Sequence, residues 1–476
     1  MNIREGLTFD DVLLVPQHSN IISRSQTDLK TRLSKKIALN IPMVSANMDT
    51  VTEANMAIAF AREGGIGIVH RFLNIEDQAE LVRKVKRSES IIIEQPYTIT
   101  SQQKIKDAID HMKKFGISGL IVVDNNNKLV GIITSKDIRF ESNLERNVAD
   151  IMTKNVVTAK HGITIDEAKE ILHNNSIEKL PLIDEEKNIK GLITGKDITK
   201  MNEYPFASKD KKGRLLVGAA VGVKGDFMDR TEALLEASVD TIVVDIAHGH
   251  SENAVNAVRH IKKAFPDCEL IAGNVATSEG VKDLANAGVD AVKVGVGCGS
   301  ICITRIITGS GVPQLTAIID CAKTAMDHDI PLIADGGIRN SGDITKALAA
   351  GASTVMVGSL LAGTDESPGV SLTKNGKKYK IYRGMASFYA SLGRKFREGE
   401  LTVDDDLNDY VPEGVEALVE YKASVVEIVR QLAGGLRSGL SYCGASTIPE
   451  MQKKAEFIKI TTAGLMESMP HDVDVM

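Results

Sequence analysis

Short runs of apolar residues recur along the chain, and each ends in glycine or a polar residue. Eight of these runs are rich in valine, isoleucine and alanine, and they cover residues 41–48, 65–70, 215–223, 241–250, 270–277, 291–299, 331–338 and 354–363. A continuous apolar run is typical of a strand buried on both faces, as in a parallel sheet. The pattern therefore predicts eight buried strands.

Amphipathic stretches lie between most of these runs, at residues 231–237, 251–265, 278–287, 312–328 and 341–350. Strands that alternate with helices are typical of βαβ units. Eight such units predict an α/β fold of the (β/α)8 type, a TIM barrel. A doubly wound sheet is the alternative, but no strand leads into a G-x-G-x-x-G turn followed by an acidic residue about 20 positions later.

The second and third predicted strands are separated by about 145 residues, and this gap contains an internal repeat. Residues 99–138 and 157–198 each read as a helix, an apolar strand, an Asp-containing turn, a second strand and a closing T-[SG]-K-D-I. We expect the barrel to comprise residues 1–90 and 208–476. The insertion would cover residues 91–207, as two modules at about 91–146 and 147–207.

The overall composition excludes several classes of protein. The 476 residues carry a formal net charge of −6, which disfavours a dedicated nucleic-acid binder. No apolar run approaches the roughly 18 residues of a membrane helix, and residues 1–11 lack the apolar core of a signal peptide. The five cysteines are an odd, sparse set that suits reduced thiols. We therefore expect a cytoplasmic protein that binds neither nucleic acid nor membranes.

The segment 295–318, which follows the sixth run, is the most informative part of the chain. Gly295, Gly297 and Gly299 allow positive φ and close approach to a ligand, and Cys298 and Cys302 supply two thiols at a barrel strand end, where active-site loops lie. A cysteine here could be a nucleophile, a small buried apolar side chain or half of a metal pair. No second pair of metal ligands stands nearby in the sequence.

Two further strand ends carry candidate binding residues. Asp335 and Gly337 follow the seventh run, and Gly358 and Ser359 follow the eighth. Loops after strands seven and eight form the usual phosphate site of such barrels, through backbone N–H groups. An adjacent carboxylate can accept hydrogen bonds from a ribose diol. Together these positions favour a phosphorylated sugar or a nucleotide over simple tight turns.

Several blocks of the sequence resemble one family along essentially the whole chain. The blocks are GVGCGSICITR (295–305), LTFDDVLLVP (7–16), SANMDTVTE (45–53), GGIGIVHR (64–71), YRGM (382–385), VPEGVE (411–416) and GGLRSG (434–439). They are similar to the IMP dehydrogenase / GMP reductase family, and the repeat resembles two CBS modules, a Bateman domain. An insertion of this kind after the second strand is also a habit of that family.

The resemblance implies oxidation of inosine 5′-monophosphate (IMP) to xanthosine 5′-monophosphate (XMP) by NAD⁺. Cys302 would attack C2 of IMP and form a covalent thioimidate, which is then hydrolysed, with Thr304 close to that carbon. The remaining implied contacts are the phosphate at Ser300, Gly337, Gly358, Ser359 and Tyr382, the ribose at Asp335, the nucleoside and base at Ser45, Gly384, Met385 and Glu413, and NAD⁺ at Asp245, Asn274 and Gly295.

The resemblance also implies a K⁺ ion and an assembly. Backbone carbonyls of Gly297, Gly299 and Cys302 would bind K⁺, together with Glu467, Ser468 and Met469 of a neighbouring subunit. The chain would then form a homotetramer or an octamer. ATP or GTP would bind the CBS modules near Thr134 and Asp137, and near Thr194 and Asp197. The alternative for these positions is a helix cap that needs no ligand.

The chain departs from the family pattern between YRGM and VPEGVE. An Arg-Tyr-Phe segment is usual there, and its arginine is the hydrolytic base. Here the nearest match is Arg394-Lys395-Phe396, which makes Arg394 the candidate base. Two alternatives therefore stay open. One is a GMP reductase, which converts GMP and NADPH to IMP and ammonia with Cys302, Thr304 and Glu413. The other is a nucleotide-sensing scaffold without activity.

Overall fold

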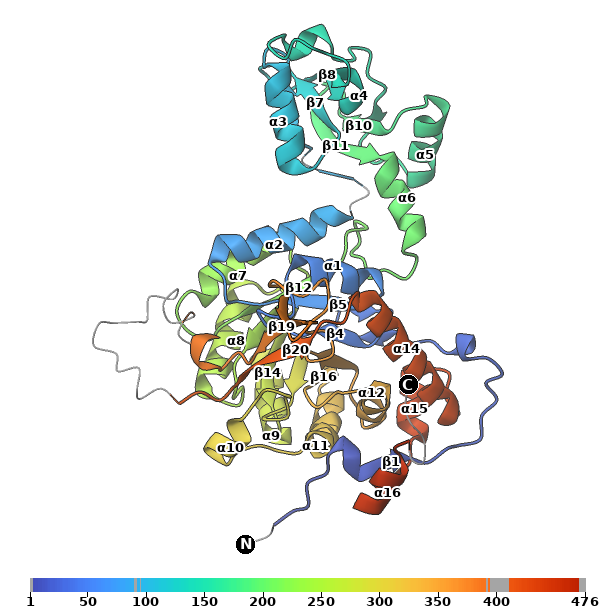
Figure 1. Ribbon diagram of the computed structural model, residues 1–476, viewed down its shortest axis with the longest axis vertical. Helices are drawn as coiled ribbons and strands as arrows, with labels where there is room; N and C mark the ends of the chain where they lie inside the picture. Colours follow the sequence, from blue (N-terminus) through green and yellow to red (C-terminus); the bar gives the residue numbers. More distant parts are fainter. Residues whose placement is uncertain (1–2, 90–91, 95, 391–392, 394–410, 471–476) are drawn as a thin grey trace, which may run out of the picture. The chain divides into compact units, whose positions relative to one another are not determined.

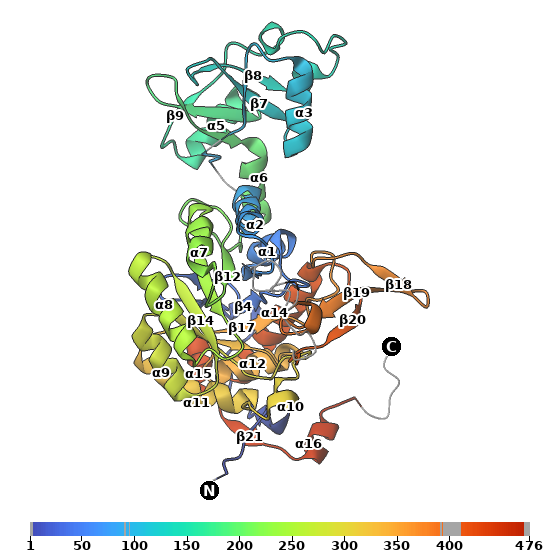
Figure 2. The same cartoon turned by 90° about the vertical axis from the view of Figure 1, so that its left-hand side faces the viewer.

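The computed structural model describes residues 3–89, 92–94, 96–390, 393 and 411–470. The chain forms two compact units, which are drawn in Figures 1 and 2. One unit contains residues up to 88, 206–210 and 215 onward, and the other contains 89–205 and 211–214. The lysine-rich stretch 209–214 is thus divided between the two units.

The first unit is built on a closed barrel of parallel strands. The strands follow the order β12-β13-β14-β15-β16-β17-β4-β5. They are β4 (Met43–Ser45), β5 (Ile66–Val69), β12 (Val217–Val221), β13 (Thr241–Asp245), β14 (Leu270–Val275), β15 (Ala291–Val294), β16 (Leu332–Asp335) and β17 (Thr354–Val357). Each predicted run contains one of these strands, so the (β/α)8 prediction is confirmed.

A helix follows each barrel strand in the chain and forms the outer layer (Figures 1 and 2). These helices are α1 (Ala54–Arg62), α2 (Ile75–Ser88), α7 (Phe227–Glu236), α8 (Glu252–Ala264), α9 (Ser278–Ala287), α11 (Gln314–Asp327), α12 (Ser341–Ala349) and α14 (Val425–Tyr442). Each turns an apolar stripe toward the strands, as helix periodicity requires. Inside the barrel, Val44, Ile68, Val243, Ile333 and Met356 belong to one fully buried cluster.

Several smaller elements frame the barrel. A three-stranded antiparallel sheet joins β18 (Leu372–Lys374), β19 (Lys377–Arg383) and β20 (Glu416–Glu420). Near the chain ends, β1 (Val12–Leu14) pairs with β21 (Phe457–Lys459), and α16 (Thr462–Glu467) follows β21. The sheet matters for the site because the end of β19 and the segment before β20 reach the mouth of the barrel. Within the ranges described above, no helix is long and apolar enough to cross a membrane.

The second unit contains two copies of one arrangement. The first copy is β6 (Thr98–Thr100), α3 (Ile105–Phe115), β7 (Gly119–Val123), β8 (Leu129–Thr134) and α4 (Ser135–Ile138). The second is β9 (Ala159–Lys160), α5 (Ile165–Asn174), β10 (Lys179–Ile183), β11 (Ile189–Thr194) and α6 (Gly195–Glu203). In each copy the middle strand pairs in parallel with the first and antiparallel with the last. The structure thus contains the internal repeat expected from the sequence.

Candidate active site

A cavity of about 580 Å³ opens at the carboxyl ends of barrel strands. This is the end at which barrels of this type carry their active sites. Many of the predicted site residues line it: Asp245, Asn274, Gly295, Gly297, Gly299, Cys302, Thr304, Asp335, Tyr382, Gly384, Met385 and Glu413. Residues from distant parts of the sequence therefore meet in one cavity.

A continuous contact chain joins a thiol, a hydroxyl and a carboxylate on the cavity wall. The sulfur of Cys302 lies 3.1 Å from Oγ1 of Thr304, and this hydroxyl donates a hydrogen bond of 2.8 Å to Oε2 of Glu413. The backbone fixes this alignment, since the amide of Ile303 donates to the carbonyl of Glu413 and the amide of Val415 donates to the carbonyl of Ile301. Such a chain can move a proton between a reacting group at Cys302 and the carboxylate.

The glycines of the loop are required by close backbone approach. Gly295 has φ +147°, and a Cβ there would lie 2.0 Å from the carbonyl oxygen of Asp335. Gly297 has φ +75°, and a Cβ there would lie 2.5 Å from Cγ of Arg305. The guanidinium of Arg305 donates to the carbonyls of Val296 and Val312 and so holds the loop closed. Larger residues at these two positions would displace the loop that carries Cys302.

The structure distinguishes the two thiols of the loop. Cys298 takes no part in the contacts between Cys302, Thr304 and Glu413. Its S–H donates instead to the carbonyl of Asp335 (3.1 Å) and to Oε1 of Gln314 (3.2 Å). Burial raises the pKa of the Cys298 thiol to about 12, so it stays protonated at neutral pH. Only the thiolate of a cysteine is a good nucleophile. Cys298 therefore matches the buried apolar interpretation, and Cys302 is the candidate nucleophile.

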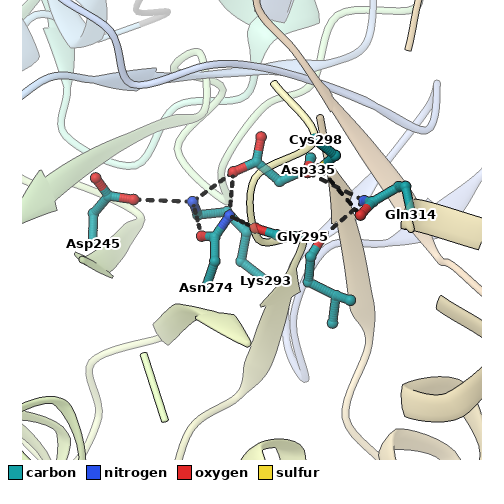
Figure 3. Close-up of polar contacts among 8 residues, drawn as sticks. Asp245, Asn274, Lys293, Gly295, Cys298, Gln314 and Asp335 are labelled. Carbon is teal, nitrogen blue, oxygen red and sulfur yellow. Dashed lines mark hydrogen bonds and ion pairs between the residues drawn. The ribbon is translucent and has the colours of Figure 1, made fainter. Parts of the chain in front are cut away.

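A buried lysine connects the ribose and cofactor candidates (Figure 3). Nζ of Lys293, on β15, donates to Asp245 Oδ1 (2.9 Å), to Asp335 Oδ2 (2.7 Å) and to Oδ1 of Asn274. Asn274 in turn donates to Asp335 Oδ2 (2.9 Å) and to the carbonyl of Gly295 (2.7 Å). Sequence reasoning missed Lys293, although a lysine inside the apolar run AVKVG was a visible signal.

The charges of this network stabilise one another. Burial opposes the charged form of Lys293, but the carboxylates of Asp245 and Asp335 outweigh it and hold the pKa of the ammonium above its ordinary value. Burial likewise opposes ionisation of Asp245, but the ammonium of Lys293, with help from Arg71, keeps the pKa of that carboxyl below its ordinary value. The ammonium of Lys293 therefore favours the charged form of the Asp245 carboxyl on the wall of the cavity.

The residues expected to hold a phosphate form a neighbouring group. The hydroxyl of Tyr382 lies 3.4 Å from Oγ of Ser300, and a Cβ at Gly358 would lie 3.3 Å from the same hydroxyl. Ser359 follows Gly358 directly, and its carbonyl accepts a hydrogen bond from Lys422. Gly337 follows the cavity-lining Gly336 at the end of β16. Ser300, Tyr382 and Gly358 are thus neighbours, but of the five residues only Tyr382 lines the cavity, so a phosphate site here stays a prediction.

Some predicted residues are not brought to the cavity wall. Ser45 is fully buried at the end of β4, and its hydroxyl lies 2.9 Å from that of Thr52. Its neighbours Asn47 and Met48 line the cavity instead. Glu467, Ser468 and Met469 are also absent from the lining. Arg394, the candidate base, lies outside the described residues.

In the inserted unit, the first repeat contains the helix cap that we considered as the alternative to a ligand site. The amide and the hydroxyl of Thr134 both donate to Oδ2 of Asp137, at 2.7 Å each, at the start of α4. This accounts for Thr134 and Asp137 without a bound ribose. Nucleotide binding at the insertion stays a prediction.

The oxygen ligands expected for K⁺ fit a hard cation. The carbonyls of Gly297, Gly299 and Cys302 come from one short loop. Helix α16 ends at Glu467, and the last carbonyls of a helix accept no hydrogen bond from within that helix. The end of a helix also carries partial negative charge. The donor set is made of oxygen alone, the kind that hard cations take. In the described ranges no three His, Cys, Asp or Glu side chains gather as a transition-metal site would need.

Comparison with known proteins gives a consistent result. The sequence model of the IMP dehydrogenase / GMP reductase domain matches residues 6–471. Inosine-5′-monophosphate dehydrogenase of Nitrosopumilus maritimus is 67% identical over 477 residues, which cover 100% of both chains. The dehydrogenase of the same name from Aquifex aeolicus is 56% identical, with 99% of this chain and 96% of the relative covered.

Solved structures agree in fold and carry the other name of the family. A variant of the GMP reductase of Trypanosoma brucei, in complex with guanosine 5′-monophosphate, superposes with a TM-score of 0.93 at 46% identity, covering 99% of each chain. The reductase from the same organism with guanosine 5′-triphosphate has a TM-score of 0.81 at 41% identity, covering 96% of this chain and 98% of that one. Both activities of the family therefore stand among the relatives.

Proposed function

The chain belongs to the IMP dehydrogenase / GMP reductase family, and from this premise we propose that it oxidises IMP to XMP with NAD⁺ as hydride acceptor. The observation that carries the proposal is the contact chain from Cys302 through Thr304 to Glu413 on the cavity wall. The choice of dehydrogenase over reductase rests on the curated relatives, which are dehydrogenases at 67% and 56% identity.

In the first half-reaction, the thiolate of Cys302 adds to C2 of the purine and forms a C–S bond. The hydrogen on C2 then leaves with its electron pair as a hydride to NAD⁺, which gives NADH and a thioimidate on the enzyme. The thiol proton can pass to Glu413 through the hydroxyl of Thr304, since both hydrogen-bond contacts are already in place. A soft thiolate suits reversible addition to an electrophilic ring carbon.

In the second half-reaction, water attacks C2 of the thioimidate, and loss of the C–S bond returns the thiolate and releases XMP. A base must remove a proton from this water. Arg394 is the predicted base, and it would need a special environment because an arginine normally keeps its proton. Thr304 and Glu413 are the described groups beside the reacting sulfur that could share this task.

The other lining residues would orient the two substrates. The carboxylate of Asp335 would accept hydrogen bonds from the IMP ribose, and Asp245, Asn274 and Gly295 would face the nicotinamide side. The phosphate would lie among Ser300, Gly337, Gly358, Ser359 and Tyr382, with Gly384 and Met385 beside the base. Asn47 and Met48 would take the place on the wall that we expected for Ser45.

A K⁺ ion would bind the carbonyls of Gly297, Gly299 and Cys302, joined by those of Glu467, Ser468 and Met469 from a neighbouring subunit. When bound, the ion would stabilise the conformation of the loop that carries the nucleophile. The proposed site thus requires an assembly of at least two chains, and a homotetramer fits a barrel whose loop is completed by its neighbour. ATP or GTP would bind the inserted repeats.

The test follows reduced nicotinamide by absorbance in two reactions, each with K⁺. One contains IMP and NAD⁺, and the other contains GMP and NADPH. Sustained NADH production in the first, lost in Cys302→Ser, is the expected result. The matched control is Cys298→Ser, which exchanges the neighbouring thiol that hydrogen-bonds away from Thr304 and should keep most of the turnover.

Other outcomes would replace the proposal. Loss of NADPH in the second reaction with release of ammonia would make the chain a GMP reductase, the activity named for the superposed solved structures. A single burst of NADH without turnover would show that hydride transfer works and hydrolysis fails. No reaction in either, with ATP or GTP still bound, would favour the scaffold alternative.

A further inference from the structure

The ammonium of Lys293 is shared by the two halves of the cavity, because Asp335 is assigned to the IMP ribose and Asp245 to the nicotinamide side (Figure 3). We propose that Lys293 is a positioning residue that holds both carboxylates in their binding orientation and so links the IMP half of the site to the NAD⁺ half. This inference rests on the proposed function, since it takes the roles of the two carboxylates from it.

The geometry leaves Lys293 no freedom to do anything else. An ammonium has three N–H donors, and those of Lys293 are directed at Asp245, Asn274 and Asp335. Its side chain lines the cavity but is only 3% exposed, and no N–H donor is left over for a ligand in this arrangement. The residue therefore acts through its partners, which is why we assign it positioning and not catalysis.

The partners, in contrast, keep groups available for ligands. The hydrogen bonds that Lys293 and Asn274 donate to the Asp335 carboxylate both end on Oδ2. Oδ1 accepts no hydrogen bond from the described residues, and Asp335 lines the cavity. One oxygen is therefore used for orientation and the other is left for a ribose hydroxyl. If the carboxylate rotated, Oδ1 would no longer be the oxygen that faces the ribose.

Removal of the ammonium would leave two carboxylates in one cavity wall without the cation between them. Like charges at short range disfavour joint ionisation, and a buried charge without a partner is strongly unfavourable. Asn274 would also lose the hydrogen bond that Lys293 donates to its Oδ1. The amide group of Asn274, which donates to the carbonyl of Gly295, would then be less firmly oriented. We expect both substrates to bind less well.

The chain contains a matched control for this experiment. Lys86, on α2, is also buried between two aspartates, at 2.6 Å from Asp240 and 3.1 Å from Asp210, and it does not line the cavity. A methionine at either position removes a buried ammonium from two carboxylates. Only the change at Lys293 removes it from the proposed site.

The experiment compares wild type, Lys293→Met, Lys293→Arg and Lys86→Met. Dissociation constants for IMP and for GMP are measured by calorimetry, and KM and kcat are measured wherever the wild type turns over. For Lys293→Met we expect nucleotide Kd and the KM for NAD⁺ to rise by about tenfold or more, with a smaller fall in kcat, since misplaced binding groups have effects of up to about 10²-fold. Lys293→Arg keeps the positive charge and should restore both to within a few-fold.

A pH profile separates positioning from a loss of stability. In wild type, Lys293 and Arg71 oppose the effect of burial on Asp245 and keep its pKa low, and Asp335 is the other carboxylate that faces Lys293. Without Lys293 the balance shifts toward the protonated form, so the acid limb of the KM for NAD⁺ should move to higher pH in Lys293→Met. It should stay in place in Lys86→Met, whatever that variant loses in thermal stability.

The outcomes are distinct. If wild type binds IMP or GMP and Lys293→Met binds it equally well, the role of Lys293 is wrong while the proposed function stands. If Lys86→Met weakens binding as much as Lys293→Met does, the effect is structural and the inference is likewise wrong. If wild type binds neither nucleotide, the proposed function fails and the inference falls with it.

Discussion

At the scale of single residues, the contacts of each cysteine, and not the residue type, identify the candidate nucleophile. The chain has five free cysteines, and burial raises the pKa of Cys268 to about 11 and of Cys298 and Cys321 to about 12. The sulfur of Cys302 meets a hydroxyl that is itself hydrogen-bonded to a carboxylate. The hydroxyl of Thr304 is thus the link on which the proposed proton path depends.

We expect Thr304→Val to lower kcat by about 10²-fold, because it removes the hydroxyl between Cys302 and Glu413 at almost constant volume. The KM for IMP should change little, since the thiol, the ribose site and the phosphate site remain. Steady-state NADH production measures both. The matched control is Thr308→Val on the same helix, α10 (Thr304–Thr308), whose hydroxyl donates to the carbonyl of Thr304 and accepts from the amide of Ser310, away from Cys302 and Glu413. Equal kcat in the two variants would exclude the proton path.

The sequence predicted the site residues in loops and near strand ends better than a residue inside an apolar strand. Cys302, Asp335 and Glu413 stand in glycine-rich or strand-end segments whose composition marks them, and all three line the cavity. Lys293 stands inside an apolar run, where periodicity predicts only a buried strand. Its role depends on Asp245 and Asp335, which belong to two other strands, so no local pattern contains it.

At the scale of elements, the block GGLRSG has a packing explanation. Gly435 and Gly439 lie one turn apart on α14 and face α12, where a Cβ would meet Oγ of Ser341 at 2.1 Å and the side chain of Thr345 at 2.5 Å. Gly434 is exposed, and a Cβ there would have nothing within 4 Å. Two adjacent glycines on one helix therefore have opposite expected effects.

Gly434→Ala should stabilise the barrel by about 0.5–1 kcal/mol, because alanine loses less conformational entropy in a helix interior than glycine. Gly435→Ala should destabilise it by roughly 1–3 kcal/mol, because the methyl group forces α14 away from α12. Thermal or urea unfolding followed by circular dichroism gives both values. Two shifts of the same sign would contradict the proposed helix contact.

Predictability also differed among elements. The eight barrel strands are continuous apolar runs, so they could be located from the sequence. The sheet of β18, β19 and β20 was not predicted, because β18 is exposed throughout and β19 reads KKYKIYR, with few apolar positions. The turn Asn375-Gly376 between β18 and β19 is a local hairpin signal that was overlooked, whereas β20 pairs with β19 across a long connection that leaves no local signal. Yet this sheet carries Tyr382 into the cavity.

At the scale of the whole molecule, the insertion is a compact unit with its own strands, helices and hydrophobic clusters. All eight barrel strands, and every described residue assigned to the active site, lie outside residues 89–205. The ends of the insertion are close together, because Lys86 Nζ lies 3.1 Å from Asp210 Oδ2 and Asn40 donates to the carbonyl of Phe206. The second unit has hydrophobic clusters of its own around Leu120 and Leu180.

We therefore expect a chain in which about six Gly and Ser residues replace 89–205 to fold and to retain the IMP-dependent production of NADH to within a few-fold. About six residues span up to 20 Å, which is ample for ends joined by one ion pair. Circular dichroism and the absorbance assay on the shortened and full-length chains test this. A folded barrel without turnover would show that the insertion contributes to the site.

The same pair of chains tests the predicted nucleotide binding, since an effect of ATP or GTP on the rate should occur only with the insertion present. An undiminished effect in the shortened chain would place the nucleotide site on the barrel. The repeats would then bind no nucleotide, and the contact between Thr134 and Asp137 would serve only to stabilise the start of α4.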